Sequence, residues 1–238
     1  MSERAVVLAG GQGARLRPFT WVIPKPLMPV GDYPILEFIV RQLARDGFRH
    51  ITLAVNYRAN LIKAFFEDGA RWNVKIDYSL ETESLSTIAP LRLVRDLPPH
   101  FLLLNGDVLT DMDFGAFLDR HRQSDRLFTV AAAERTHVSD YGVLSVDSAN
   151  VLTGFSEKPA TRYLVSMGVY GVSRRVVDLV PAGRKFGFDD LMLYCLAHRH
   201  EVKVEPYAGY WLDIGRPEDH AKAMEDADLL KAKLLGDG

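Results

Sequence analysis

The sequence predicts an α/β fold with a Rossmann-like, mostly parallel central sheet that is flanked by helices. In the first half of the chain, short apolar runs typical of buried strands alternate with amphipathic runs typical of helices. This alternation favours right-handed βαβ units and therefore parallel strands. In the second half, strand-like runs follow one another with little helix between them, which indicates antiparallel additions to the sheet.

The first half supplies four expected strands and the helices between them. The strands are expected at residues 5–8, 51–55, 74–78 and 101–104. The helices are expected at residues 34–47 and 60–66, with a short one at 91–95. Pro34 suits the first turn of its helix, and Gly47 suits the stop at the other end.

The second half begins with a helix for which Asp113 is the candidate N-cap. Further strands are expected at residues 127–132, 142–146, 152–156, 166–172 and 202–207. Further helices are expected at residues 113–121, 174–179, 189–198 and 217–235. We expect the last helix to pack on the same domain, in preference to a contact between copies of the chain, although a homo-oligomer stays open.

The composition is that of a globular domain, with 47% hydrophobic and 25% charged residues in 238. A formal net charge of −2 argues against a general nucleic-acid binder, which is normally basic. The one cysteine, Cys195, excludes an internal disulfide and lies in an apolar stretch, so we expect an inert buried thiol. No leader or membrane-spanning run is apparent, and we therefore expect a cytoplasmic protein without a membrane partner.

A glycine-rich loop directly follows the first expected strand. Gly10, Gly11 and Gly13 let the backbone approach a ligand closely, and Arg15 and Lys25 follow within a few residues. Together these groups form a candidate site for a polyanion such as a triphosphate. The alternative is an ordinary turn with two solvated cations. The spacing matches neither the dinucleotide fingerprint nor a P-loop.

Two carboxylates are candidates for a metal site. Asp107 follows the apolar strand 101–104 through Asn105 and Gly106, so it is expected at the carboxyl edge of the sheet, where the glycine loop also lies. Asp213 lies near the end of the chain, before the last expected helix. Carboxylate oxygens beside phosphates are suited to Mg²⁺, whereas each Asp alone could equally cap a turn.

These motifs resemble the signature of the sugar-1-phosphate nucleotidyltransferases. The resemblance rests on Leu8-Ala9-Gly10-Gly11-x-Gly13-x-Arg15-Leu16-x-Pro18 and on Pro24-Lys25-Pro26. Trp211-x-Asp213-x-Gly215-x-Pro217 is similar to the late metal motif of that family. The chain looks most like the short mannose- and heptose-1-phosphate guanylyltransferases. The resemblance implies an enzyme that joins a nucleoside triphosphate to a sugar 1-phosphate and releases pyrophosphate.

The resemblance also implies a sugar-binding part at about residues 113–216. Glu157 in Glu157-Lys158-Pro159 would hold sugar hydroxyls, and Lys158 would hold the sugar phosphate. Gly142, Gly168 and Val169 match segments that line the sugar site in the family. The nucleotide-binding part would span about residues 1–112 of a single domain, 1–238, with the last helix at about 217–235.

One segment departs from the family pattern. Relatives carry a proline and two glycines where this chain has Ser84, Ser86 and Ala89. The resemblance assigns this segment, with Glu81 and Thr87, to the base and ribose. Leu8, Ala9, Asn105 and Gly106 complete the expected nucleotide contacts. We expect GTP, with uridine as a close second.

The expected mechanism needs no general base, because a phosphate oxygen of the sugar 1-phosphate is already anionic. Arg15 would hold the β- and γ-phosphates, Lys25 the α-phosphate, and Lys158 the incoming phosphate, with Mg²⁺ on Asp107 and Asp213. Two alternatives stay open at this point. One is a non-catalytic, regulatory nucleotide-sugar-binding subunit, and the other is a cytidylyltransferase acting on a non-sugar phosphate.

Overall fold

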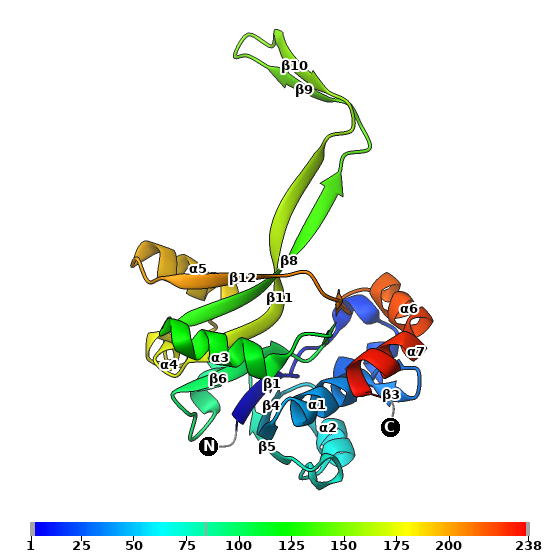
Figure 1. Ribbon diagram of the computed structural model, residues 1–238, viewed down its shortest axis with the longest axis vertical. Coiled ribbons are helices and arrows are strands. Elements are labelled where there is room, and N and C mark those ends of the chain that lie inside the picture. Colours follow the sequence, from blue (N-terminus) through cyan, green and yellow to red (C-terminus); the bar gives the residue numbers. More distant parts are fainter. Residues whose placement is uncertain (1–2, 84, 237–238) are drawn as a thin grey trace.

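The computed structural model describes residues 3–83 and 85–236, and its centre is a seven-stranded sheet (Figure 1). The strands lie in the order β12-β8-β11-β6-β1-β4-β5. They are β1 (Glu3–Leu8), β4 (Phe48–Val55), β5 (Lys75–Leu80), β6 (His100–Asn105), β8 (Phe128–Val138), β11 (Ala160–Ser173) and β12 (Val202–Tyr207). The expected strand at 101–104 is thus β6, next to β1 at the middle of the sheet.

The sheet is mostly parallel, as the alternation of strands and helices predicted. β1 pairs in parallel with β4 and with β6, β4 pairs in parallel with β5, and β12 pairs in parallel with β8. Within this sheet β11 alone runs against its neighbours, β6 and β8. The prediction of a Rossmann-like sheet with an antiparallel addition is therefore confirmed.

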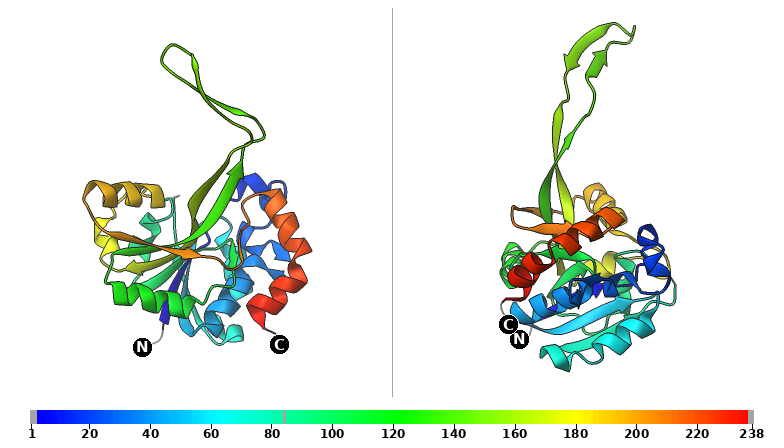
Figure 2. Two further views of the ribbon diagram at one scale, coloured as in Figure 1. Left: turned by 45° about the horizontal axis from the view of Figure 1, so that its top comes forward. Right: turned by 90° about the vertical axis from the view of Figure 1, so that its right-hand side faces the viewer.

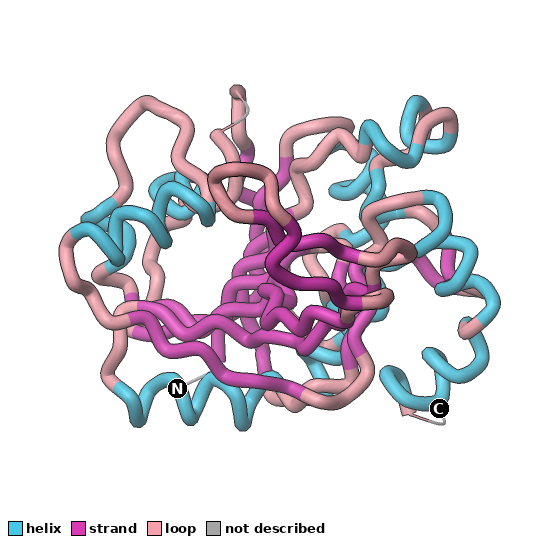
Figure 3. Tube along the Cα trace, turned by 90° about the horizontal axis from the view of Figure 1, so that it is seen from above, coloured by secondary structure: helices cyan, strands magenta, loops and turns pink. Residues whose placement is uncertain are grey.

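Helices cover both faces of the sheet (Figure 3). α1 (Ile35–Arg45), α2 (Ala59–Phe66) and α3 (Phe114–Ser124) share one apolar core with one face. A 3-10 helix (Ala89–Leu93), α4 (Val176–Leu179) and α5 (Phe188–Ala197) pack on the other. Asp113 caps α3 as predicted, because its carboxylate accepts a hydrogen bond of 2.8 Å from the Ala116 amide. Cys195 is buried in the second core.

The C-terminal segment folds back on the rest of the domain. It consists of α6 (Pro217–Glu225), α7 (Ala227–Leu230) and one π-helical turn (Lys231–Leu235), where the sequence predicted a single helix. Buried Ala223, Leu230 and Leu234 pack in a third core with Leu16 and Phe38. Among the described residues, no helix combines the length and the apolar character needed to cross a membrane.

Four short strands complete the fold. β2 (Pro29–Val30) pairs with β3 (Tyr33–Pro34), and β7 (Val108–Thr110) pairs with β13 (Trp211–Asp213), both antiparallel. The sequence did not predict these ladders. The β7–β13 ladder positions functional residues, because it joins the segment after β6 to the segment before α6.

A long two-stranded arm projects from the body of the protein (Figures 1 and 2). The outer halves of β8 and β11 form its stem, where Ala160 pairs with Val138 and Leu164 pairs with Glu134. β9 (Val143–Val146) and β10 (Leu152–Ser156) form its tip. We call residues 134–164 the projecting arm. The sequence predicted strands at 127–132 and 166–172, so it predicted the buried halves of β8 and β11 and not the exposed stem.

Candidate active site

The loops that follow β1 and β6 lie against each other at the carboxyl edge of the sheet. Leu8 at the end of β1 is paired with Asn105 at the end of β6. The Gly106 amide donates a hydrogen bond of 2.9 Å to the Leu8 carbonyl oxygen, and the Ala9 amide donates one of 2.8 Å to the carbonyl oxygen of Ala54. The structure thus brings the glycine loop and the Asn105-Gly106-Asp107 segment together.

Gly13 gives the glycine loop its shape. Its φ is +61°, in the left-handed region, and a Cβ atom there would lie 2.9 Å from Cγ2 of Thr20. The buried Thr20 hydroxyl donates a hydrogen bond of 2.8 Å to the Gly13 carbonyl oxygen, which fixes the turn. The 3-10 turn Ala14–Leu16 follows at once and carries Arg15.

Lys25 and Asp107 form an ion pair at the floor of this site. The Lys25 side chain is 10% exposed and the Asp107 side chain 23% exposed. Lys25 Nζ donates to Asp107 Oδ2, whereas Asp107 Oδ1 is buried and has no hydrogen-bond partner among the described residues. A buried carboxylate oxygen without a partner is costly unless a ligand satisfies it.

The β7–β13 ladder brings Asp213 to the same place. Asp213 pairs with Val108, the residue after Asp107, and the Ile214 amide donates a 3.0 Å hydrogen bond to the Asp107 carbonyl oxygen. Asp213 is accessible to solvent, but the protein atoms packed around its carboxylate raise its pKa, and the negative charge of Asp107 raises it further. The positive charges of Lys25 and Arg15 act in the opposite direction on that pKa.

These four side chains form one charged cluster, which we call the phosphate cluster: Arg15, Lys25, Asp107 and Asp213. A Cβ atom on Gly215 would lie 3.3 Å from the Arg15 guanidinium, so that glycine leaves room for Arg15 next to Asp213. Two cations and two carboxylates at one edge of a sheet can bind a polyphosphate together with a divalent cation.

The cluster fits Mg²⁺ as a partial ligand set. The described residues hold no group of three or more His, Cys, Asp or Glu side chains around one metal position. Mg²⁺ commonly takes only one or two protein carboxylates and fills its other positions with water and substrate phosphates. Asp107 Oδ1, unpaired and next to a second carboxylate, has the chemistry of such a ligand.

A cavity of about 270 Å³ is lined by Asp107 and by most of the residues that are predicted to contact the nucleotide, and we call it the nucleotide cavity. Its lining residues are Leu8, Gly10, Gly11, Asn56, Glu81, Ser86, Thr87, Asn105 and Asp107. Burial raises the pKa of Glu81, and the Leu85 amide donates to its carboxylate. Asn56 was not predicted, although it follows β4 at the same edge of the sheet as the other candidates.

The segment that departs from the family pattern forms one wall of this cavity. Ser86 has a φ of +74°, in the region that glycine adopts freely and L-residues rarely adopt. The Phe188 amide donates a hydrogen bond of 2.8 Å to the Thr87 hydroxyl, and the Ala89 amide donates one of 2.9 Å to the Phe186 carbonyl oxygen. This wall is therefore fixed to the start of α5. Ser84 lies outside the described residues.

The residues predicted to bind the sugar are divided between the body and the projecting arm. Gly168 has a φ of +75°, and a Cβ atom added to it would lie 2.6 Å from the side-chain nitrogen of Asn105. Val169 pairs with Leu104 of β6. Gly142, Glu157 and Lys158 lie on the arm, and all three are exposed. None of these five residues is among those that line the nucleotide cavity.

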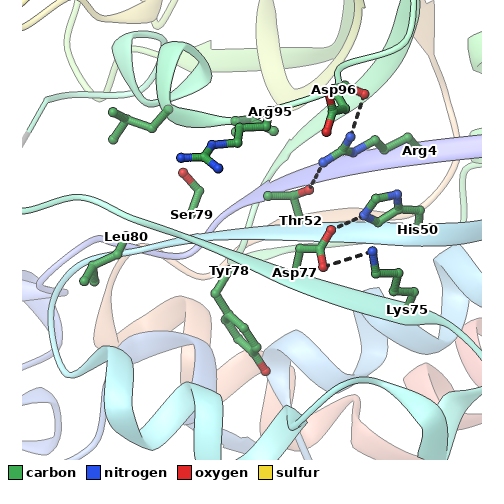
Figure 4. A pocket seen from close by; sticks show the side chains of 12 residues that line it. Arg4, His50, Thr52, Lys75, Asp77, Tyr78, Ser79, Leu80, Arg95 and Asp96 are labelled. Atoms are coloured by element: carbon green, nitrogen blue, oxygen red, sulfur yellow. Dashed lines mark hydrogen bonds and ion pairs between the residues drawn. The ribbon is translucent and has the colours of Figure 1, made fainter.

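A larger cavity, of about 590 Å³, lies beside β4 and β5 (Figure 4). Several of its polar groups are engaged in contacts within the protein. Asp77 binds His50 and Lys75, and Arg4 donates to the Thr52 hydroxyl and to the Asp96 carbonyl oxygen. No residue of the phosphate cluster lines this cavity, whereas Asp107 lines the smaller one.

Comparisons with known proteins agree with this geometry. The family model described as "Nucleotidyl transferase" matches residues 4–228. The chain is 33% identical over 224 residues to a mannose-1-phosphate guanyltransferase of Yarrowia lipolytica, covering 91% of this chain and 61% of that protein. It is 30% identical over 241 residues to a UTP–glucose-1-phosphate uridylyltransferase of Synechocystis sp., covering 93% and 62%. The chain thus spans about three fifths of these relatives' lengths.

One solved structure is similar to this chain over almost its whole length. HddC from Yersinia pseudotuberculosis, complexed with GMP-PN, has a TM-score of 0.71 and 26% sequence identity to this chain. The match covers 95% of this chain and 99% of HddC.

Proposed function

The chain belongs to the nucleotidyl transferase family, and from that premise we propose that it transfers a nucleoside monophosphate from a nucleoside triphosphate to a sugar 1-phosphate. The products are a nucleoside diphosphate sugar and pyrophosphate. The observation that carries this proposal is the phosphate cluster, whose Asp107 also lines the nucleotide cavity. Asp107 and Asp213 are 106 positions apart in the chain, yet the β7–β13 ladder holds them side by side with Lys25.

The reaction is a substitution at the α-phosphorus. An anionic oxygen of the sugar 1-phosphate forms a new bond to that phosphorus, while the bond from the phosphorus to the bridging oxygen breaks and pyrophosphate leaves. No proton has to be removed from the nucleophile, so the residues act by alignment and by charge neutralisation. Arg15 binds the β- and γ-phosphates that become the leaving group, and Lys25 faces the α-phosphate.

Asp107 and Asp213 would hold the magnesium ion, which, when bound, neutralises phosphate charge and orients the triphosphate. In the structure Lys25 neutralises Asp107 directly. The ammonium of Lys25 would also bind a phosphate oxygen of the substrate, and Asp107 would then hold the magnesium ion through its carboxylate. Lys25 thus neutralises the charge of Asp107 before the substrate binds and the charge of a substrate phosphate afterwards.

For the substrates we propose GTP together with a mannose- or heptose-type 1-phosphate. The guanyltransferase relative and the HddC structure complexed with GMP-PN support this choice. The uridylyltransferase relative makes UTP with glucose 1-phosphate the second candidate. A buried free thiol at Cys195 and a nucleoside triphosphate substrate both fit a reducing compartment, and we place the enzyme in the cytoplasm.

The test is a matrix of the common nucleoside triphosphates against several sugar 1-phosphates, read by pyrophosphate release in the presence of Mg²⁺. We expect release that requires both substrates, with GTP ahead of UTP. Arg15→Met should reduce turnover about a hundredfold or more, as removal of a charge partner of the transition state does. Arg17→Met, also exposed and two residues away, is the matched control. No release from any pair would refute the proposed activity.

A further inference from the structure

The projecting arm exposes apolar side chains that a free surface rarely carries. Leu144 and Phe155 at the tip are both 62% exposed, and Val138 and Leu164 on the stem are 53% and 56% exposed. An isolated two-stranded ladder is only marginally stable in water, and a continuous exposed apolar surface marks a site of association. The arm therefore has the character of a segment that another surface covers.

The same chain carries an apolar groove of about 450 Å³ beside the root of the arm. The groove lies between α5 and the strands β8, β11 and β12. Its walls include Phe188, Met192, Leu196, Val202 and Val204, and Leu196 is 76% exposed. Polar side chains contribute little to it, which matches the chemistry of the arm.

The arm does not fill the groove of its own chain. Leu164 and Ser166 at the root of the arm form part of the groove wall, so the arm rises beside the groove. The β8–β11 ladder continues without interruption from Ser166–Ala132 to Ala160–Val138, a stem of about 20 Å at the usual rise per residue. Figures 1 and 2 show the arm pointing away from the body in each view.

We propose that the arm of one copy of this chain lies in the groove of a second copy, and that each copy thereby supplies Glu157 and Lys158 to the other copy's active site. The exchange is reciprocal, so in a twofold dimer each arm occupies the groove of the other chain and the assembly is closed. The role of Glu157 and Lys158 in this inference rests on the proposed function, whereas the seating of the arm does not.

The wall of the groove contacts the wall of the nucleotide cavity. Phe188 of the groove stacks on Tyr170 with ring centroids 5.0 Å apart, and its amide binds Thr87 of the cavity wall. Ser166 of the groove wall lies on β11 two residues before Gly168, and Gly168 packs against Asn105 of the nucleotide cavity. An arm that lies in the groove would therefore bring Glu157 and Lys158 toward this cavity.

The proposed contact between the arm and the groove is tested without any substrate. Light scattering after gel filtration should give a dimer for the wild type and a monomer for Leu144→Glu/Phe155→Glu, with unchanged circular dichroism. Leu229→Glu is the matched control, since Leu229 is 48% exposed on α7, and it should stay dimeric. In a Cys195→Ala background, chains with Phe155→Cys and chains with Leu196→Cys, when mixed, should be joined by a short bismaleimide. A monomeric wild type, or mixed chains that fail to join, would overturn the proposal.

The exchange of site residues is tested with two inactive variants. Chains with Lys158→Ala and chains with Arg15→Ala, given different affinity tags and purified together as a heterodimer, form one site with every residue intact. Such a heterodimer should recover about half of the wild-type activity, because one of its two sites is complete. An inactive heterodimer would show that each arm serves its own chain. If the wild type itself releases no pyrophosphate, the proposed function fails, and the cross-linking result still decides the seating of the arm.

Discussion

The ion pair between Lys25 and Asp107 makes a prediction about stability that is separate from activity. Replacing Lys25 by Met keeps most of the side-chain volume and removes the ammonium group. The Asp107 carboxylate then loses its one cationic hydrogen-bond partner among the described residues, and its Oδ1 is buried and unpaired. Removing one partner of a buried ion pair costs about 3–5 kcal/mol. Because the Asp107 side chain is 23% exposed, we expect a loss of about 3 kcal/mol, at the low end of that range.

The assay is urea denaturation in buffer with a chelator, applied to Lys25→Met, Asp107→Asn and the double variant. Asp107→Asn leaves a buried ammonium without its partner, so it is also destabilised, whereas in the double variant neither member of the pair is charged. We expect a coupling free energy of about 2 kcal/mol between the two substitutions. All three variants should lack activity, so the double variant recovers stability without recovering turnover.

An exposed pair provides the control. Lys231 and Asp32 lie 3.8 Å apart, with side chains 53% and 81% exposed. The cycle of Lys231→Met and Asp32→Asn should give a coupling below about 0.5 kcal/mol. If the Lys25–Asp107 coupling is no larger than this value, the reasoning about the buried pair is wrong.

Three further predictions concern single residues. Ser86→Gly should raise the free energy of unfolding by about 1 kcal/mol, because a glycine adopts the positive φ of this position without strain; Ser86→Ala retains a Cβ atom and should show no such gain in urea melts. Burial lowers the pKa of His121 from 6.5 to about 4, so the unfolded chain binds more protons in this interval and stability should rise by about 3 kcal/mol from pH 4 to 6.5. His121→Gln should flatten that slope in urea melts across pH, whereas the exposed His137→Gln should keep it; an unchanged slope in His121→Gln would contradict the assignment. Asp213→Asn should lower turnover about a hundredfold or more, because it removes one of the two proposed metal ligands, and the exposed side chain should leave the melting temperature in metal-free buffer nearly unchanged; turnover at the wild-type level would contradict the metal assignment.

The central sheet could be predicted from the sequence because its strands are buried on both faces. Ala5, Val6 and Val7 are fully buried, and continuous apolar runs of this kind have few alternative interpretations. The meeting of the glycine loop with Asp107 also followed from the sequence, since both follow parallel strands and such strands end at one edge.

The stem of the projecting arm could not be predicted in the same way. Glu134–Val138 and Ala160–Leu164 are exposed on both faces, so no alternation of apolar and polar residues marks them as strands. The β7–β13 ladder has only three residue pairs, too few for a periodic signal. That ladder positions Asp213, and this explains why the sequence indicated the residue only through a motif.

The same ladder has a consequence for the order in which the protein is made. The two carboxylates of the phosphate cluster are far apart in the chain, because Asp213 follows Asp107 by 106 positions. A growing chain on the ribosome can complete the β1–β4–β6 core and the glycine loop while Asp213 is still unsynthesised. During this interval the chain lacks the second carboxylate. Nascent chains and fragments cut before β13 therefore cannot assemble the phosphate cluster.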